Sequence, residues 1–314
     1  SSDRIDLNLL KVKDLRYGEN PHQKAAFYLQ KNEKKYFEQL HGKALSYNNF
    51  FDIETSISIV NEFDVLSCVI IKHANPCGVA SDNDITIAYQ KAFEADSTSA
   101  FGGVIALNRK LEEETATKII GNQFVEVIIA PGVSRSSLQV LSSKDNIRIL
   151  DIEQLNDSIP GFKFLSVTGG LLIQETDNRT VSKEDLKVVS LREPSNKEIQ
   201  DCLFAWKVCK FVKSNAVVYA KDNQTVGVGA GQMSRIDSAQ IAASKAKEMG
   251  FETRGCVMAS DAFFPFRDTV DSAASIGITS IIQPGGSIRD NEIIEAANET
   301  NMAMVFTGIR HFRH

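Results

Sequence analysis

The sequence has few of the residues that metal or disulfide chemistry requires. It contains only 5 cysteines, an odd number with no C-x-x-C spacing: Cys68, Cys77, Cys202, Cys209 and Cys256. They lie mostly in apolar stretches, as reduced buried thiols do, so we assign them no chemistry. No histidine is followed two positions later by glutamate, and Pro76-Cys77 has no second cysteine behind it. The sequence therefore lacks the ligand pattern of a zinc-dependent deaminase, and we expect no zinc.

Positive charge and long apolar runs are also scarce. The 35 Lys and Arg residues against 40 Asp and Glu residues give a net charge of -5, which leaves no global basic field for nucleic acid. No apolar run reaches the length of a membrane span, and the first residues show no secretory signal. We expect a cytoplasmic protein without nucleic-acid or membrane partners. Its 314 residues, 43% of them hydrophobic, suffice for two subdomains that each bury a core.

A Lys-His pair follows the most apolar run of the first half. Residues 69–71 predict a buried parallel strand, after which Lys72 and His73 precede a turn indicated by Pro76 and Gly78. Ligands of open α/β sheets bind beyond the carboxyl ends of such strands. Neighbouring strand residues face opposite sides, so both side chains reach one pocket only if the backbone leaves the strand there. The pair suits proton transfer beside a developing negative charge, or it could simply face solvent.

Strands and helices alternate along the chain, which predicts an α/β fold with a partly parallel sheet. The strands are expected at 104–107, 125–130, 215–220, 256–259, 279–282 and 303–306, and the helices at 85–95, 111–120, 238–249, 269–276 and 291–299. Similar Ile-Ile and Pro-Gly endings at 128–132 and 281–285 indicate a duplicated αβα unit with a period of roughly 150 residues. We expect a linker at 1–14, subdomains at 15–150 and 197–314, and a connector at 151–196. The polar stretch from about 145 to 196 has strand-like runs near Ile149 and Leu171.

Three loops could bind ligands. The loop at Arg16 and Tyr17 could grip a phosphate or be merely solvated. The glycines at 227, 229 and 231 lack the context of a dinucleotide fingerprint, so they indicate backbone approach to a ligand or a sharp bend. The loop 260–268 places three phenylalanines around a proline, with two carboxylates and an arginine. It could hold a flat heterocycle with Asp268 on its polar edge, or be a surface loop pinned by its aromatics.

Five motifs together resemble the AICAR transformylase family, the carboxy-terminal part of the bifunctional AICAR transformylase and IMP cyclohydrolase. They are Lys72-His73-Ala74-Asn75-Pro76, Lys213-Ser214-Asn215-Ala216, the runs 229–235 and 260–268, and the terminal Arg310-His311-Phe312-Arg313-His314. The resemblance implies a duplicated cytidine-deaminase-like fold without zinc and a homodimer whose active site is shared between subunits. It implies formyl transfer from 10-formyltetrahydrofolate to 5-aminoimidazole-4-carboxamide ribonucleotide (AICAR) in IMP biosynthesis, and it leaves room for a monovalent cation. The cyclohydrolase domain is expected in a part of the parent polypeptide that precedes this chain.

The resemblance also implies roles for individual residues, matched motif by motif. The catalytic residues would be Lys72, His73 and Asn215. The ribonucleotide contacts would be Arg16, Tyr17, Gly102, Glu126, Arg235, Phe263 and Arg310, with Glu126 standing where some family members have a shorter acid. The folate-binding residues would be Ile236, Phe266, Asp268, Ser287 and Ile288. The alternative from another class is a catalytically silent nucleotide-binding or assembly subunit of the same fold.

Overall fold

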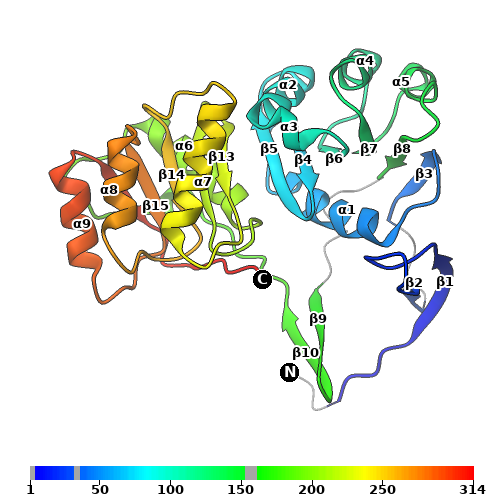
Figure 1. Cartoon of the computed structure of the whole chain (residues 1–314), viewed down its shortest axis with the longest axis horizontal. Coiled ribbons are helices and arrows are strands. Elements are labelled where there is room, and N and C mark those ends of the chain that lie inside the picture. Colours follow the sequence, from blue (N-terminus) through cyan, green and yellow to red (C-terminus); the bar gives the residue numbers. More distant parts are fainter. Residues whose placement is uncertain (1–3, 32–35, 153–160) are drawn as a thin grey trace.

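The computed structural model describes residues 4–31, 36–152 and 161–314. A first half contains, in chain order, β3 (Glu38–His41), α1 (Tyr47–Val60), β4 (Ser67–Lys72), β5 (Asn75–Ser81), α2 (Ile85–Ala95), α3 (Ser97–Ala100), β6 (Gly103–Leu107), α4 (Glu113–Asn122), β7 (Val125–Ala130), α5 (Arg135–Leu141) and β8 (Arg148–Asp151). A second half contains β11 (Lys187–Val188), α6 (Asn196–Cys209), β12 (Val217–Lys221), β13 (Gln224–Gly229), α7 (Arg235–Glu248), β14 (Val257–Ser260), α8 (Asp268–Ser275), β15 (Ser280–Gln283), α9 (Asp290–Glu299) and β16 (Ala303–Phe306). Figure 1 shows the two halves beside each other.

Within the described residues, the two halves join in one mixed sheet of 12 strands, in the order β11-β16-β15-β14-β12-β13-β5-β4-β6-β7-β8-β3. Both halves repeat one pairing pattern. β4 is antiparallel to β5 and β6, and β6, β7 and β8 are parallel. β12 is likewise antiparallel to β13 and β14, and β14, β15 and β16 are parallel. The sheet is therefore partly parallel, as the alternating pattern predicted.

The prediction that the strand before Lys72 is parallel is wrong, because β4 lies between two antiparallel neighbours. Its apolar run has a different origin. Val69 and Ile71 pack in a core with α1, whereas Cys68 and Ile70 pack in a separate core with α2 on the opposite face. A strand covered on both faces is apolar throughout, whatever the direction of its partners.

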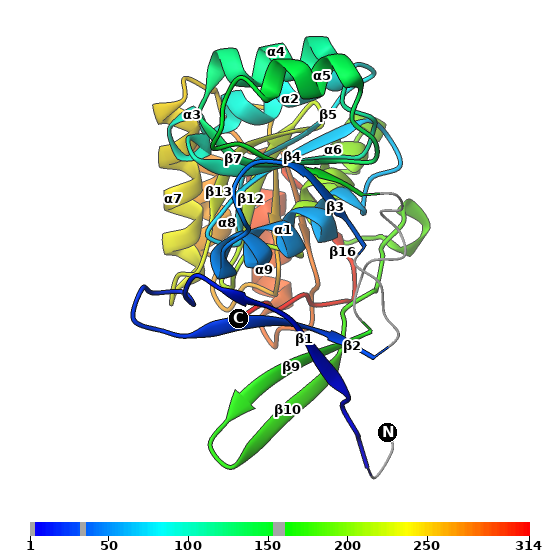
Figure 2. The same ribbon diagram turned by 90° about the vertical axis from the view of Figure 1, so that its right-hand side faces the viewer.

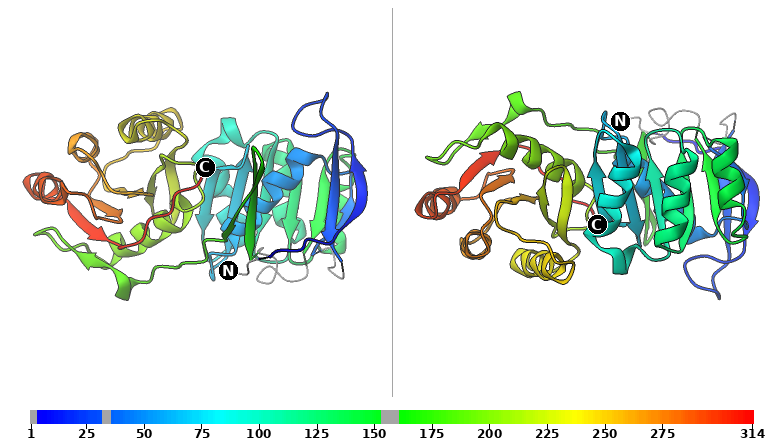
Figure 3. Two further views of the ribbon diagram at one scale, coloured as in Figure 1. Left: turned by 90° about the horizontal axis from the view of Figure 1, so that it is seen from below. Right: turned by 90° about the horizontal axis from the view of Figure 1, so that it is seen from above.

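The halves meet where β13 lies beside β5. Gln224 pairs there with Ala80, and the Ser81 amide donates a hydrogen bond to the Asn223 carbonyl oxygen at 2.9 Å. The Thr225 hydroxyl accepts a hydrogen bond from the Val79 amide at 3.0 Å. Packing on one face adds to this junction, since Phe63 after α1 lies 5.4 Å from Phe204 of α6, ring centre to ring centre. The chain's C-terminus also lies between the halves (Figure 3).

In the ranges that the structure describes, two hairpins lie outside the large sheet. β1 (Leu9–Leu15) pairs with β2 (Ala25–Gln30), and β9 (Phe162–Val167) pairs with β10 (Gly170–Glu175). Figure 2 shows the β9–β10 hairpin projecting away from the body of the molecule. The expected linker at 1–14 therefore includes most of a strand, and the expected connector contains a hairpin, a short 3-10 helix (Lys183–Asp185) and β11. The strand-like runs near Ile149 and Leu171 are confirmed as β8 and β10.

The glycine-rich stretch after Thr225 is strand β13 as far as Gly229. Gly231, with a φ of 68°, forms the expected bend after the strand. A Cβ atom on Gly227 or Gly229 would overlap the carbonyl oxygens of Ala242 and Ser238 on α7. A Cβ atom on Gly78 of β5 would likewise overlap the carbonyl oxygen of Ala92 on α2. These glycines let the helices pack closely on the strands, a reason that the sequence analysis did not give. Gly227 also lines the cavity described below. In the described part of the chain, no helix is long and apolar enough to cross a membrane.

Candidate functional site

His73 and Ala74 form the tight turn between β4 and β5. Both have positive φ angles, 52° and 56°, and the flanking Lys72 and Asn75 pair across the hairpin. This is the backbone of a type I′ turn, which suits the twist of a hairpin but disfavours residues other than glycine, asparagine and aspartate. The turn expected at Pro76 and Gly78 is therefore wrong, because those residues belong to β5.

A cavity of about 210 Å³ lies beside this turn, at the junction of the two halves. Its lining includes Lys72 and His73 from the first half, Thr225 and Gly227 from β13, and Lys245 from α7. Because the backbone leaves the strand at His73, the side chains of Lys72 and His73 can both line this cavity. The structure thus places the predicted Lys-His pair together on a concave surface.

Charged groups line the cavity. The Lys72 ammonium group donates a hydrogen bond to the Phe101 carbonyl oxygen at 2.8 Å, and that of Lys245 lies 3.0 Å from the Asp96 carboxylate. Burial alone would raise the pKa of Asp96, but hydrogen bonds from Ser99 and the charge of Lys245 lower it overall, so this carboxylate is ionised. The lining therefore contains two lysine side chains and one ionised carboxylate. This balance suits an anionic ligand or an anionic transition state.

The nearby thiol of Cys77 is not a nucleophile. It lines the same cavity, but burial raises the pKa of Cys77 to about 12. A thiol with so high a pKa is protonated at neutral pH, and the thiolate is the nucleophilic form. The site therefore offers an imidazole and amines rather than a covalent nucleophile. No group of three or more His, Cys, Asp or Glu side chains is placed to hold a metal ion in the residues that the structure describes.

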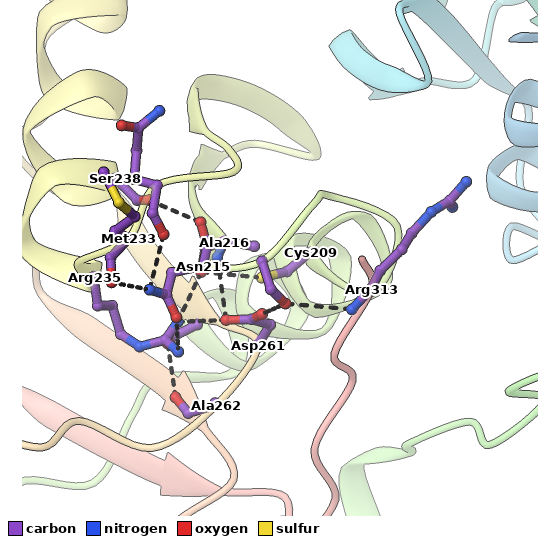
Figure 4. Close-up of polar contacts among 12 residues, drawn as sticks. Cys209, Asn215, Ala216, Met233, Arg235, Ser238, Asp261, Ala262 and Arg313 are labelled. Atoms are coloured by element: carbon purple, nitrogen blue, oxygen red, sulfur yellow. Dashed lines mark hydrogen bonds and ion pairs between the residues drawn. The ribbon is translucent and has the colours of Figure 1, made fainter. Parts of the chain in front are cut away.

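Asn215 lies just before β12 in a dense hydrogen-bond network (Figure 4). Its side-chain amide donates to the carbonyl oxygens of Gln232 and Met233 at 2.9 and 3.1 Å. Its side-chain oxygen accepts a hydrogen bond from the Arg235 guanidinium at 2.9 Å. Arg235 is only 7% exposed and also pairs with the Asp261 carboxylate. Arg235, predicted as a nucleotide contact, therefore holds Asn215 in place in this structure.

Asp261 is a functional candidate that the sequence analysis missed. Its side chain is wholly buried and accepts hydrogen bonds from the Ser214 hydroxyl, the Ala216 amide and Arg235. Its backbone carbonyl accepts from the His311 amide at 3.1 Å. Asp261 thus ties the end of β14 to the start of β12, to α7 and to the C-terminal segment. The signal was the pair of carboxylates in the loop 260–268, of which only Asp268 was assigned a role.

One contact joins the two groups of residues. The side-chain oxygen of Asn75, at the start of β5, accepts a hydrogen bond from the Lys213 amide at 3.0 Å. Lys213 lies two residues before Asn215, and Asn75 two residues after His73. The predicted catalytic residues therefore come from two segments that are hydrogen-bonded to each other at the junction.

The residues predicted near the folate lie on the surface of the second half. Phe266 is 52% exposed, and so in part is Phe263, predicted as a nucleotide contact, at 38%, whereas Phe264 is buried in the core. Of the three phenylalanines expected around a ligand, two remain available. The Arg289 guanidinium lies 4.8 Å from the Phe266 ring centre, and exposed Asp268 starts α8 and accepts from the Thr269 amide at 2.7 Å. The remaining members are half-buried Ile236 and Ser287 and fully exposed Ile288.

The other predicted nucleotide contacts are scattered. Gly102, with φ of 75°, donates from its amide to Phe124, and Glu126 on β7 accepts from the Asn49 amide group at 2.9 Å. Arg16 and Tyr17 follow β1 and do not line the cavity at His73; the Arg16 guanidinium lies 5.5 Å from the Tyr17 ring. Arg310 is exposed and stacks on Phe312 at 4.2 Å.

A family model described as "AICARFT/IMPCHase bienzyme" matches residues 1–245. Among solved structures, this chain is similar to one titled "Structural genomics, protein ybgI, unknown function". The two share 11% sequence identity, over 66% of this chain and 72% of that chain, with a TM-score of 0.17. At that TM-score the likeness supports no conclusion about fold or function.

Proposed function

The chain belongs to the AICARFT/IMPCHase bienzyme family of purine biosynthesis, and from this premise we propose that it transfers the formyl group of 10-formyltetrahydrofolate to AICAR. The products would be formyl-AICAR and tetrahydrofolate. The observation that carries the proposal is that Lys72 and His73 line one cavity at the junction of the halves. Lys245 contributes a second ammonium group to the same cavity.

The reaction requires help with protons and charge. The 5-amino group of AICAR is a weak nucleophile because its lone pair is delocalised into the ring and the carboxamide. As its nitrogen forms a bond to the formyl carbon, His73 accepts the amine proton. The tetrahedral intermediate carries an oxyanion that an ammonium group stabilises, and we assign this role to Lys72, which lines the same cavity as His73. The bond from the formyl carbon to the folate nitrogen then breaks, and that nitrogen takes a proton from the Lys72 ammonium group or from protonated His73. The proton removed from the amine thus balances the one given to the folate. No covalent enzyme intermediate is needed.

Substrate positions follow from the same proposal. The ribonucleotide would contact Arg16, Tyr17, Gly102, Glu126, Arg235, Phe263 and Arg310, and the folate would contact Ile236, Phe266, Asp268, Ser287 and Ile288. The exposed rings of Phe263 and Phe266 support stacking with a flat heterocycle. Arg235 can meet a ligand only if it shares its guanidinium with Asn215 and Asp261, since it already bonds to both.

We also propose that the two halves are cytidine-deaminase-like subdomains, at 15–150 and 197–314. Their shared strand pairing supports this, since β12, β13 and β14 repeat the arrangement of β4, β5 and β6. The close packing of a helix on a strand glycine recurs as well, at Gly78 and Gly229.

An absorbance assay tests the proposed function directly. Purified protein with both substrates should release tetrahydrofolate, whereas omission of AICAR should abolish the absorbance change. Without AICAR there is no amine to accept the formyl group, so the site of Lys72 and His73 is expected to release no tetrahydrofolate. Tight binding of both substrates without turnover would instead favour the silent nucleotide-binding subunit.

A homodimer with shared active sites is part of the proposal. The β9–β10 hairpin carries exposed apolar side chains, namely Phe162, Phe164, Leu165, Val167, Leu171 and Leu172. An isolated two-stranded hairpin is marginally stable in water, and contiguous exposed apolar side chains mark interaction surfaces. Both facts support a partner chain over this hairpin.

Subunit mixing tests the shared site. Lys72→Ala and Arg16→Ala proteins should each be inactive on their own. We expect Arg16 to serve the site that contains Lys72 of the neighbouring subunit. After exchange of equal amounts, about half of the dimers are mixed, and each mixed dimer has one intact site, so roughly a quarter of wild-type activity should return. The measurement is the folate assay, with exchange verified by native mass spectrometry. Complete exchange without recovered activity would assign Arg16 to its own subunit.

A further inference from the structure

The turn that carries His73 has an unusual conformation for its sequence. His73 and Ala74 both occupy the left-handed region, although neither is glycine, asparagine or aspartate. L-residues with a Cβ atom disfavour this region. Such a turn persists only when the surrounding structure fixes it.

Asp52 on α1 supplies that constraint. Its side-chain oxygen accepts a hydrogen bond from the Ala74 amide at 2.7 Å, and the His73 amide also interacts with this carboxylate. Ala74 is fully buried, so its amide has no access to water and needs a protein acceptor. Asp52 is 22 residues before Ala74 and lies on a different element, so this is a tertiary contact and not a local feature of the hairpin.

The helix that presents Asp52 is itself fixed. Ser46 caps α1 and forms a capping box with Asn49, whose side-chain amide also bonds to Glu126 on β7 at 2.9 Å. The first turn of α1 is therefore attached to the sheet, and Asp52 follows one turn later. Burial raises the pKa of Asp52, while the Ala74 amide and His73 oppose that shift. The carboxylate thus faces the turn as a partly desolvated acceptor that meets the backbone amides of Ala74 and His73 and the charge of the His73 ring.

We propose that Asp52 is a positioning residue that holds His73 and Ala74 in the left-handed turn and thereby directs the His73 side chain to the cavity. The proposal rests on the proposed function only in assigning His73 to proton transfer. That Asp52 fixes the turn is inferred from its hydrogen bonds to the turn in this structure. A position error of about an ångström at a general base can lower a rate by up to a hundredfold, so the effect should appear in kcat.

The test uses three variants of the full chain. Asp52→Ala should lower kcat by roughly tenfold to a hundredfold with KM within about threefold of wild type, because the substrates are still bound but the base is misplaced. Asp52→Asn keeps a side-chain oxygen as acceptor and should retain most of the activity. The double variant Asp52→Ala with Ala74→Gly should recover at least half of the lost activity on a logarithmic scale, because glycine adopts positive φ without steric cost.

A merely structural role of Asp52 would not respond to Ala74→Gly in this way. Asp64→Ala, an exposed acid just beyond the same helix, is the matched control and should leave kcat unchanged. Wild-type kcat in Asp52→Ala, or no recovery in a folded double variant, would overturn the proposal.

A second readout separates this inference from the proposed function. Hydrogen exchange of the Ala74 amide, measured by NMR, should accelerate at least tenfold in Asp52→Ala and much less in Asp52→Asn. Protected Ala74 in Asp52→Ala would overturn the positioning role whether or not formyl transfer occurs. If the wild-type protein transfers no formyl group but Ala74 loses protection as expected, the proposed function fails and the hold of Asp52 on the turn stands.

Discussion

His73→Ala and Lys72→Ala should each lower the rate of formyl transfer by on the order of a hundredfold or more, while substrate affinity changes little. The reason is that both groups act mainly in the transition state. His73 accepts a proton as the new bond forms, and Lys72 stabilises charge that is absent from the bound substrates. Their side chains line one cavity, so removal of either leaves the other in place.

The measurement is kcat and KM in the folate assay, together with AICAR binding by calorimetry. Lys118→Ala is a matched control, because Lys118 is an exposed lysine on α4 in the same half. Near-normal turnover in His73→Ala or Lys72→Ala would refute the assigned roles. A loss of binding in parallel with turnover would assign the residue to substrate binding instead.

Asp261→Ala should cause the largest loss of stability, about 3–5 kcal/mol, because it leaves the buried Arg235 guanidinium without its ion partner. Arg235 is 7% exposed and Asp261 is fully buried, so solvent cannot replace the lost contact. The Ser214 hydroxyl and the Ala216 amide lose their acceptor in the same substitution. Since Arg235 also bonds to Asn215, formyl transfer should fall together with stability.

Chemical denaturation of the purified variant measures the free energy of unfolding. Asp237→Ala provides the comparison, because Asp237 is an exposed acid in the first turn of α7 and should contribute only about 0.3–1 kcal/mol through the helix dipole. If Asp261→Ala costs no more than Asp237→Ala, the network around Asp261 is not the support that its contacts indicate.

Local patterns predicted much of the fold. The predicted ranges 85–95, 125–130 and 303–306 have the same first and last residues as α2, β7 and β16. Each has an unbroken hydrophobic period and clear end signals. Pairing direction was not predictable in this way. β4 is apolar because α1 and α2 cover its two faces, and that burial is the same for parallel and antiparallel neighbours.

The site was predicted in part for similar reasons. The Lys72-His73 pair is visible because its residue types suit proton transfer, and the structure places both on one cavity. Asp52 was missed because its acceptor role depends on a backbone amide 22 residues away. Asp261 was missed because an acid in a loop with Arg267 and Asp268 resembles a solvated residue, whereas its position after β14 buries it completely.

The seam between β5 and β13 has a consequence for solubility. In a separate half, β5 or β13 would be the border of its sheet and would present unpaired backbone groups that invite association with other chains. In the fused chain the two strands lie side by side, joined by the pair Gln224 and Ala80 and by the hydrogen bond from the Ser81 amide to the Asn223 carbonyl oxygen. Among the residues that the structure describes, the borders of the large sheet are β11 and β3, with only 2 and 4 residues. Two halves in one polypeptide therefore leave the large sheet with only short strands exposed to self-association.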